Sequence, residues 1–205
     1  MYPCLLDWTI STPFDPHYFY QGAWLARKIK HNEPNLHVDV GSSVMMISVL
    51  SAMVKIVFVD YRPLIADLSG MNSVGANITQ LPFQSDSLSS LSCQHVIEHI
   101  GLGRYGDPID PDGSINAAKE LERVLKPGGK LYLSLPVGRE RICFNAHRVH
   151  APNSVVEFFS HMKLIDFSYV DDNGAFLEEQ SLDAAQDNEY ACGMYVFEKT
   201  DASSE

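Results

Sequence analysis

Apolar positions along the chain follow two patterns that alternate from the amino terminus onward. Runs that are apolar and β-branched, such as residues 55–60, are typical of buried parallel strands, whereas apolar residues spaced three or four apart, as in residues 18–30, are typical of helices. The pattern predicts strands at residues 36–40, 55–60, 74–79, 88–95, 130–135, 164–170 and 190–199. It predicts helices at residues 18–30, 44–54, 115–125 and 153–162, and a short helix that opens at Pro63.

Proline, glycine and asparagine residues predict where two helices end or begin. Pro127-Gly128-Gly129 predicts the end of the 115–125 helix, because proline cannot continue a helix and glycine tolerates a left-handed cap. Asn153 is a residue type that caps helix starts, so we expect it to cap the 153–162 helix.

The order of these elements predicts an α/β fold. Strands that alternate with helices imply a parallel sheet covered on both faces, because parallel strands need crossover connections. The acidic segment at residues 171–188 contains no helical pattern, so the strands on either side of it are expected to pair antiparallel. We therefore expect a doubly wound, mostly parallel seven-stranded sheet with one antiparallel strand.

Length favours one domain. A chain of 205 residues is long enough for a single sizeable core, so one domain over residues 1–205 is expected. Within it we expect a helical cap at residues 1–34 and a disordered tail at residues 200–205.

Composition and charge narrow the class of partners. The chain carries 15 basic and 26 acidic side chains, and its net charge of −11 opposes the phosphate contacts on which nucleic-acid binding relies. Four widely spaced cysteines without a CxxC pair argue against a disulfide framework or a zinc ribbon. No run reaches the roughly 18 apolar residues of a membrane span, and the first residues do not resemble a signal peptide. These features predict a cytoplasmic protein with a small-molecule or protein partner and no nucleic acid.

Three motifs in the middle of the chain carry a family resemblance. They are Leu81-Pro82-Phe83, Val96-Ile97-Glu98-His99 and Lys126-Pro127-Gly128-Gly129-Lys130-Leu131. In this order they closely resemble the second half of class I S-adenosylmethionine-dependent methyltransferases. The resemblance implies a Rossmann-like methyltransferase fold and S-adenosyl-L-methionine as the cofactor.

From Phe14 to Lys199 the chain also resembles a little-characterised methyltransferase-like subfamily. This likeness rests on the Val-Gly-Ser-Ser loop at residues 40–43, the run at residues 96–108, and the His-Arg-Val-His segment at residues 147–150. Some such proteins accompany enzymes of surface-polysaccharide or nucleotide-sugar synthesis, which implies a saccharide hydroxyl as the methyl acceptor.

The resemblance places the cofactor at the carboxyl ends of the strands, where doubly wound sheets bind their ligands. The expected cofactor residues follow the first four strands and are Asp39, Gly41, Ser42, Ser43, Asp60, Tyr61, Asn77, Ile78 and His95. A carboxylate at Asp60 is suited to accept both ribose hydroxyls, the Asn77 amide oxygen to accept from the adenine amine, and Ile78 to pack on the adenine face. Ser43 and Met45 stand where the family usually has glycines, and Met45 is expected to narrow the pocket.

The candidate catalytic residues are histidines at the same edge of the sheet. Methyl transfer requires an aligned acceptor and a base, and imidazole has a pKa near neutrality. His95, His99 and His147 follow strand ends and are the predicted catalytic residues. A structural alternative for the Glu98-His99 pair is a glutamate bonded to backbone amides. Similarly, the loop with Arg139, Arg141 and Arg148 is interpreted either as a grip for a phosphate or carboxylate or as a solvated loop.

Acidic residues in the long loop at residues 101–113 do not predict a metal. Asp107, Asp110 and Asp112 alternate with proline and glycine, and Asp-Pro and Asp-Gly pairs form turns, so no metal ligand is expected. The N-terminal aromatics are expected to pack on the sheet, with contact of Tyr18 or Tyr20 with the cofactor as the alternative.

Together these features predict a methyltransferase that acts on a small-molecule or sugar hydroxyl. One alternative is a non-catalytic binding or scaffold module of the same shape, whose cofactor site is weakened by Ser43 and Met45. A nicotinamide-dependent oxidoreductase is less compatible with the sequence, because the chain contains no G-x-G-x-x-G turn.

Overall fold

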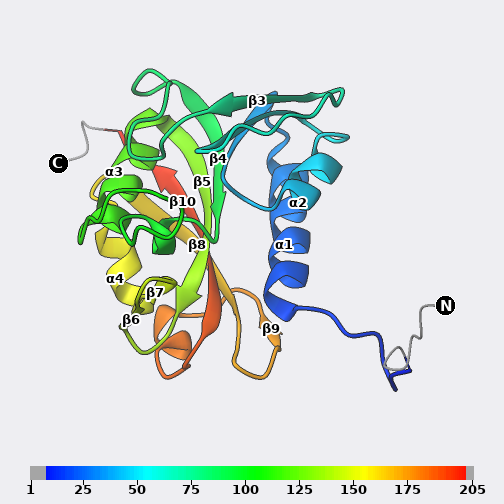
Figure 1. Ribbon diagram of the computed structural model, residues 1–205, viewed down its shortest axis with the longest axis vertical. Coiled ribbons are helices and arrows are strands. Elements are labelled where there is room, and N and C mark those ends of the chain that lie inside the picture. Colours follow the sequence, from blue (N-terminus) through cyan, green and yellow to red (C-terminus); the bar gives the residue numbers. More distant parts are fainter. Residues whose placement is uncertain (1–7, 202–205) are drawn as a thin grey trace.

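The computed structural model describes residues 8–201, which form one central sheet with helices on both faces (Figure 1). The strands of this sheet are β1 (Leu36–Val40), β2 (Lys55–Asp60), β3 (Met71–Gly75), β4 (Leu88–Gln94), β5 (Leu125–Val137), β8 (Met162–Val170), β9 (Phe176–Leu177) and β10 (Ala191–Lys199). A separate hairpin pairs β6 (Arg141–Cys143) with β7 (His147–Val149). The helices are α1 (Pro16–Asn32), α2 (Val44–Leu50), α3 (Gly113–Val124) and α4 (Pro152–Glu157), with short 3₁₀ turns η1 (Ile97–His99) and η2 (Leu182–Ala185).

Strand order confirms the expected fold class. The order across the sheet is β3-β2-β1-β4-β5-β10-β8-β9. The first five of these strands are mutually parallel, and β10 runs antiparallel to both β5 and β8. The seven expected strands are all present, and the two-residue β9 extends the sheet at its edge.

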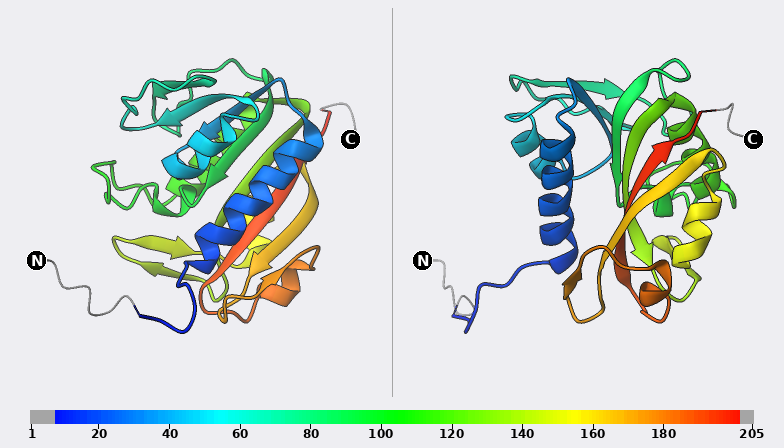
Figure 2. Two further views of the ribbon diagram at one scale, coloured as in Figure 1. Left: turned by 90° about the vertical axis from the view of Figure 1, so that its right-hand side faces the viewer. Right: turned by 180° about the vertical axis from the view of Figure 1, so that it is seen from behind.

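Two apolar layers hold the helices against the sheet. Helices α1 and α2 cover one face, and α3 and α4 cover the other (Figures 1 and 2). The first helix begins where the Asp15 carboxylate accepts the Tyr18 backbone N–H at 3.3 Å, and Pro16 occupies its first turn. Its buried face includes Trp24, Leu25 and Ile29, as the helical spacing predicted.

Several element boundaries differ from the sequence-based expectation. No helix opens at Pro63, because the chain returns irregularly to β3 and the Leu64 N–H donates to the Ser73 hydroxyl at 3.1 Å. The third strand lies at Met71–Gly75, where its register matches Ile56–Asp60, and an Asn77 turn follows it. Helix α2 ends at Leu50 rather than at residue 54.

The two predictions from proline, glycine and asparagine have different outcomes. Helix α3 ends at Val124, one residue before the expected end, but it passes directly into β5, so Gly128, at φ +74°, lies within that strand rather than at a helix cap. Ala151, not Asn153, precedes α4, because Pro152 occupies the first turn, and the Asn153 amide instead donates to Asp183 at 3.1 Å.

The chain ends can be compared with the expectation only in part. Residues 1–7 of the expected helical cap and residues 202–205 of the expected tail lie outside the described residues. Thr200 is tied to the sheet, because its backbone N–H donates to the His161 carbonyl at 2.9 Å. Within residues 8–201, every helix is too short or too polar to cross a bilayer.

Candidate active site

Two adjoining pockets lie at the carboxyl ends of β1, β2 and β4. The inner cavity, of about 230 Å³, lies between residues 40–41, 59–62, 76–79 and the loop at residues 95–110. The outer pocket, of about 590 Å³, lies between residues 41–44, residues 94–105 and the β6–β7 hairpin. His95 and His99 line both pockets, so the two spaces share a wall.

The inner cavity gathers six of the nine expected cofactor residues. They are Gly41, Asp60, Tyr61, Asn77, Ile78 and His95. The Asp60 side chain is 22 % exposed, and one carboxylate oxygen accepts the Arg62 backbone N–H at 2.7 Å. The Asn77 amide oxygen accepts the Thr79 N–H at 3.0 Å, which leaves one lone pair of that oxygen and the amide NH₂ for a ligand.

Gly41 lines both pockets. It adopts φ +70°, and an added Cβ would lie 3.1 Å from a Val96 methyl carbon. Its N–H donates to the Val59 carbonyl at 2.8 Å, which holds the turn against β2. Only glycine combines this backbone conformation with this close approach.

Asp39 lies beneath the pockets and lines neither of them. Its fully buried carboxylate accepts the Ser42 N–H at 3.1 Å, the Ser42 hydroxyl at 2.7 Å and a short bond from the Ser92 hydroxyl. Burial raises the pKa of Asp39 to about 6, against the lowering effect of these hydrogen bonds. Asp39 therefore holds the loop after β1 in place rather than facing a ligand.

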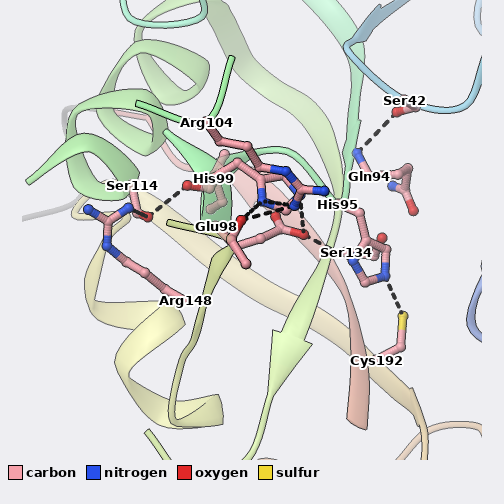
Figure 3. A network of polar contacts seen from close by, with 12 residues as sticks. Ser42, Gln94, His95, Glu98, His99, Arg104, Ser114, Ser134, Arg148 and Cys192 are labelled. Atoms are coloured by element: carbon pink, nitrogen blue, oxygen red, sulfur yellow. Dashed lines mark hydrogen bonds and ion pairs between the residues drawn. The ribbon is translucent and has the colours of Figure 1, made fainter. Parts of the chain in front are cut away.

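The loop after β1 is tied to the end of β4. The Ser42 hydroxyl accepts the Gln94 backbone N–H at 3.0 Å, and both residues, with Ser43, line the outer pocket (Figure 3). Met45 lines neither pocket and is 75 % exposed. The expectation that Met45 narrows the cofactor site is therefore wrong, because its helical position points it outward.

Two of the three expected catalytic histidines contact Glu98, and the third, His147, lies beside His99. His95 Nδ1 lies 3.0 Å and His99 Nε2 lies 3.7 Å from the Glu98 carboxylate (Figure 3). The His147 ring centre lies 6.5 Å from that of His99. Glu98 therefore faces imidazoles rather than backbone amides, and its second oxygen is buried without a hydrogen-bond partner.

The histidines differ in which ring nitrogens are free. His95 is engaged at both, because its Nε2 lies 3.3 Å from the Cys192 sulfur. His99 Nδ1 lies 2.7 Å from the Ala146 carbonyl, which accepts its proton, so Nε2 is the nitrogen that carries a lone pair in the neutral ring. Burial, together with the neighbouring His99, lowers the pKa of His147.

The arginines of the basic loop do not converge on an anion site, which was one of the two interpretations of this loop. Arg148 is buried and donates to the carbonyl oxygens of Ile100, Asp110 and Pro111, so it fixes a loop instead. Arg139 pairs with Glu189 at 2.7 Å, and Arg141 lies 3.9 Å from the same carboxylate.

The acidic loop at residues 101–113 contains the turns that its sequence predicts. Asp107 accepts the backbone N–H groups of Gly101 at 2.7 Å and Tyr105 at 3.1 Å, and these hydrogen bonds lower its pKa against the opposing effect of partial burial. Asp110 accepts the Asp112 N–H at 2.9 Å.

Sequence reasoning missed several residues around the pockets. Arg104 and Tyr190 line the outer pocket, Arg62 lines the inner cavity, and each of the two guanidinium groups lies 5.2 Å from the Tyr105 ring centre. Cys192 reaches His95 across 97 positions of sequence. Arg104 lies within the run at residues 96–108 but carries no recognisable site signal of its own, and the residues around Arg62, Tyr190 and Cys192 form no motif, so only the folded chain brings these side chains to this edge.

A family model accounts for most of the chain. Residues 45–200 match the family described as "Caenorhabditis protein of unknown function, DUF268". The chain belongs to the DUF268 family. This membership confirms the expected assignment to an uncharacterised family, and a search of curated proteins gave no significant match to this DUF268 chain.

Solved structures with the same fold include several methyltransferases. YcgJ from Bacillus subtilis is 12 % identical, with a TM-score of 0.62 over 90 % of this chain and 100 % of its own. The N-methyltransferase NodS from Bradyrhizobium japonicum WM9, solved with S-adenosyl-L-homocysteine, is 13 % identical, with a TM-score of 0.60 over 91 % of this chain and 89 % of its own. The 1,6-didemethyltoxoflavin-N1-methyltransferase from Burkholderia thailandensis, solved with its substrate and S-adenosylhomocysteine, is 14 % identical, with a TM-score of 0.58 over 94 % of both chains. At these identities the likeness establishes the class I methyltransferase fold.

Proposed function

We propose that this DUF268 chain is an S-adenosyl-L-methionine-dependent methyltransferase that acts on a hydroxyl group of a small molecule or sugar. The observation that carries the proposal is the Asp60 carboxylate, which faces a cavity at the carboxyl ends of the parallel strands. That cavity opens beside a pocket with three histidines, so a cofactor and an acceptor would meet at their common wall.

The residues of the inner cavity suit an adenosine. Asp60 would accept the ribose hydroxyls, and Ile78 would pack on the adenine face. The Asn77 oxygen, which accepts one hydrogen bond from Thr79, would use its second lone pair to accept from the adenine amine, and the Asn77 NH₂ would donate to a ring nitrogen of the adenine. When bound, the cofactor supplies an electrophilic methyl group for in-line transfer.

His99 is better placed than His95 to take the proton of an acceptor hydroxyl. The His99 Nδ1 proton is held by the Ala146 carbonyl, so Nε2 is available, whereas both nitrogens of His95 are engaged. Glu98, 3.7 Å from His99 Nε2, would stabilise the imidazolium that forms. His95 and His147 would then shape the pocket around the proton acceptor.

The outer pocket has a lining that suits a saccharide. Tyr18, Tyr105 and Tyr190 offer aromatic faces with polar tips, and Arg104 offers a cation to any acidic substituent. Neither Tyr18 nor Tyr20 lines the inner cavity, so the alternative of contact with the adenosine gains no support there, whereas Tyr18 would contact the acceptor and Tyr20 stacks on Phe176 at 5.1 Å.

The proposal is tested by calorimetric titration with S-adenosylhomocysteine. We expect one binding site in the wild-type chain and roughly 100-fold weaker binding in Asp60→Ala, because two charge-assisted hydrogen bonds are lost. Asp67→Ala is the matched control, since Asp67 is an exposed acid seven residues away that lines neither pocket. Absence of binding in the wild type, or equal affinity in Asp60→Ala, would overturn the proposal.

A further inference from the structure

A cluster of nitrogen and sulfur donors adjoins the outer pocket, which one of its members, His95, also lines. It consists of His17 on α1, His95 after β4 and Cys192 on β10, and one ligand atom from each lies within 4.8 Å of the other two. It is the one group of three or more His, Cys, Asp or Glu side chains in residues 8–201 that gathers in this way. Three segments far apart in sequence supply it, so it is a product of the fold.

We propose that His17, His95 and Cys192 bind Zn²⁺ and thereby fasten α1 to the sheet beside the candidate active site. Imidazole nitrogen and thiolate sulfur are the donors that zinc prefers, whereas magnesium and calcium take oxygen ligands. This inference goes beyond the proposed function and does not depend on it.

The distances fit a tetrahedral ion after a small contraction. Zinc bonds of about 2.0 Å to nitrogen and 2.3 Å to sulfur place two ligand atoms roughly 3.5 Å apart. His95 Nε2 and Cys192 Sγ already lie 3.3 Å apart (Figure 3). The third donor, on His17, needs to move closer by up to about 1.3 Å. His17 stands in the first turn of α1, and its ring, stacked on that of His95 at 6.0 Å and on that of Tyr190 at 5.5 Å, also needs to turn so that its lone pair points at the ion.

The surroundings of His95 match those of a metal-bound imidazole. A ligating histidine usually donates its other ring N–H to a carboxylate or carbonyl, which fixes the tautomer and the ring orientation. His95 Nδ1 lies 3.0 Å from the Glu98 carboxylate, so the nitrogen that faces Cys192 is the one with the lone pair. Glu98 would thus accept the Nδ1 proton of the metal-bound His95 and also lie beside His99 Nε2.

A fourth donor is available on the same helix face. Gln21 lies one helical turn after His17 and is 1 % exposed, and its amide oxygen lies 4.0 Å from Cys192 Sγ. The Ser134 hydroxyl donates to that oxygen at 2.9 Å and orients it toward β10. Four protein donors would close the coordination sphere, which is typical of a structural rather than a catalytic zinc site.

Cobalt titration tests the proposal, because Co²⁺ reports thiolate ligation by its absorption. The chain is freed of metal with a chelator and titrated with Co²⁺. We expect one equivalent to bind, with a thiolate-to-cobalt charge-transfer band and tetrahedral visible bands that Zn²⁺ abolishes. Cys192→Ser should lose the charge-transfer band, and His17→Ala should weaken binding by roughly 100-fold.

Matched variants separate this site from other thiols and imidazoles. Cys143 and His161 lie outside the cluster, so the Cys143→Ser and His161→Asn variants should bind Co²⁺ as the wild type does. Circular dichroism checks that each variant is folded, and His17→Ala keeps the test decisive if Cys192→Ser does not fold. No Co²⁺ binding, a charge-transfer band that survives Cys192→Ser, or unchanged Co²⁺ affinity in His17→Ala would overturn the proposal.

The proposal can fail independently of the methyltransferase assignment. S-adenosylhomocysteine affinity is measured on the same samples. Loss of the cobalt bands in a chain that binds S-adenosylhomocysteine would overturn the zinc site alone, whereas intact cobalt bands without cofactor binding would overturn the proposed function alone.

Discussion

At the residue scale, a buried histidine is held neutral beneath the candidate site. His37 lies between the hydroxyls of Ser90, at 2.7 Å, and Ser92, at 2.8 Å. Because Ser92 donates its proton to Asp39, it accepts from His37 Nε2, and Ser90 then donates to Nδ1. Burial lowers the pKa of His37 to about 3, so the folded chain excludes the proton that the unfolded chain takes up near pH 6.5.

This histidine is expected to make the fold sensitive to mild acid. Between pH 7 and pH 5 the unfolded chain protonates His37 and the folded chain does not, which lowers the free energy of unfolding by about 2 kcal/mol. Asp39 acts in the opposite direction, because its raised pKa, about 6, lets the folded chain take up a proton first as the pH falls. The His37→Asn variant keeps the Asp39 effect and loses the His37 effect. Its free energy of unfolding at pH 5, relative to that at pH 7, should therefore be higher than the same difference in the wild type by about 2 kcal/mol.

Urea denaturation at the two pH values measures this difference. His31→Asn is the control, because His31 is exposed in the last turn of α1. The same pH dependence in His37→Asn and wild type would show that His37 does not carry the effect.

The site residues that the sequence predicts lie at or shortly after strand ends. Asp60 ends β2, Ile78 follows β3 and His99 follows β4, and all three line the inner cavity, in agreement with the rule that parallel sheets bind ligands at their carboxyl edge. Asp39 also follows this rule but points inward, because Ser42 and Ser92 capture its carboxylate. Cys192 escaped notice, because its partner His95 is distant in sequence.

At the element scale, Arg148 on β7 fastens the loop that closes both pockets. Its guanidinium donates to the carbonyls of Ile100 at 2.6 Å and Asp110 at 3.1 Å, so one side chain holds both ends of this loop. Gly101 permits the close approach, because an added Cβ would lie 2.1 Å from the Asp110 carbonyl oxygen. The loop is thus an ordered wall rather than a free flap.

Removing this clamp should destabilise the chain. In Arg148→Met the apolar stem remains but buried carbonyls lose charge-assisted donors, which should lower the free energy of unfolding by about 3 kcal/mol. Arg148→Lys keeps the charge but not the forked geometry, so it should recover only part of the loss. Urea denaturation measures these free energies of unfolding. The control is Arg139→Met, which removes an exposed ion pair and should change the free energy of unfolding by less than about 0.5 kcal/mol. An equal effect of the two methionine variants would contradict the clamp.

Elements were predictable where burial alone dictates the pattern. The run Lys55–Asp60 is apolar on both faces because it lies inside a parallel sheet, and its bounds were found correctly. The Pro63 helix was wrong because proline is compatible with helix starts and with irregular chain alike, and the return to β3 selects the latter. The end of α3 was placed too late, because β5 takes over its last residues through pairing with β4.

At the scale of the whole molecule, strand order decides where a ligand can enter. The chain fills the sheet outward from β1 to β3 and then crosses back to place β4 on the other side of β1. The connections after β1 and β4 therefore leave in opposite directions and open a crevice between them. Gly41 and Val96 stand at this crevice, where the inner cavity begins.

Cofactor binding in this crevice should stabilise the entire chain, because a ligand that binds only the folded state shifts the unfolding equilibrium. At a concentration 100 times its dissociation constant, S-adenosylhomocysteine should add about 2.7 kcal/mol. For a domain of this size that corresponds to a rise in Tm of about 5–10 °C. Differential scanning fluorimetry measures it, and NAD⁺ at the same concentration is the control, because the turn after β1 lacks the glycine spacing of dinucleotide-binding folds. A rise in Tm with NAD⁺ as large as that with S-adenosylhomocysteine would favour the oxidoreductase hypothesis. A rise in Tm with S-adenosylhomocysteine that persists in Asp60→Ala would show that the ligand binds away from the end of β2.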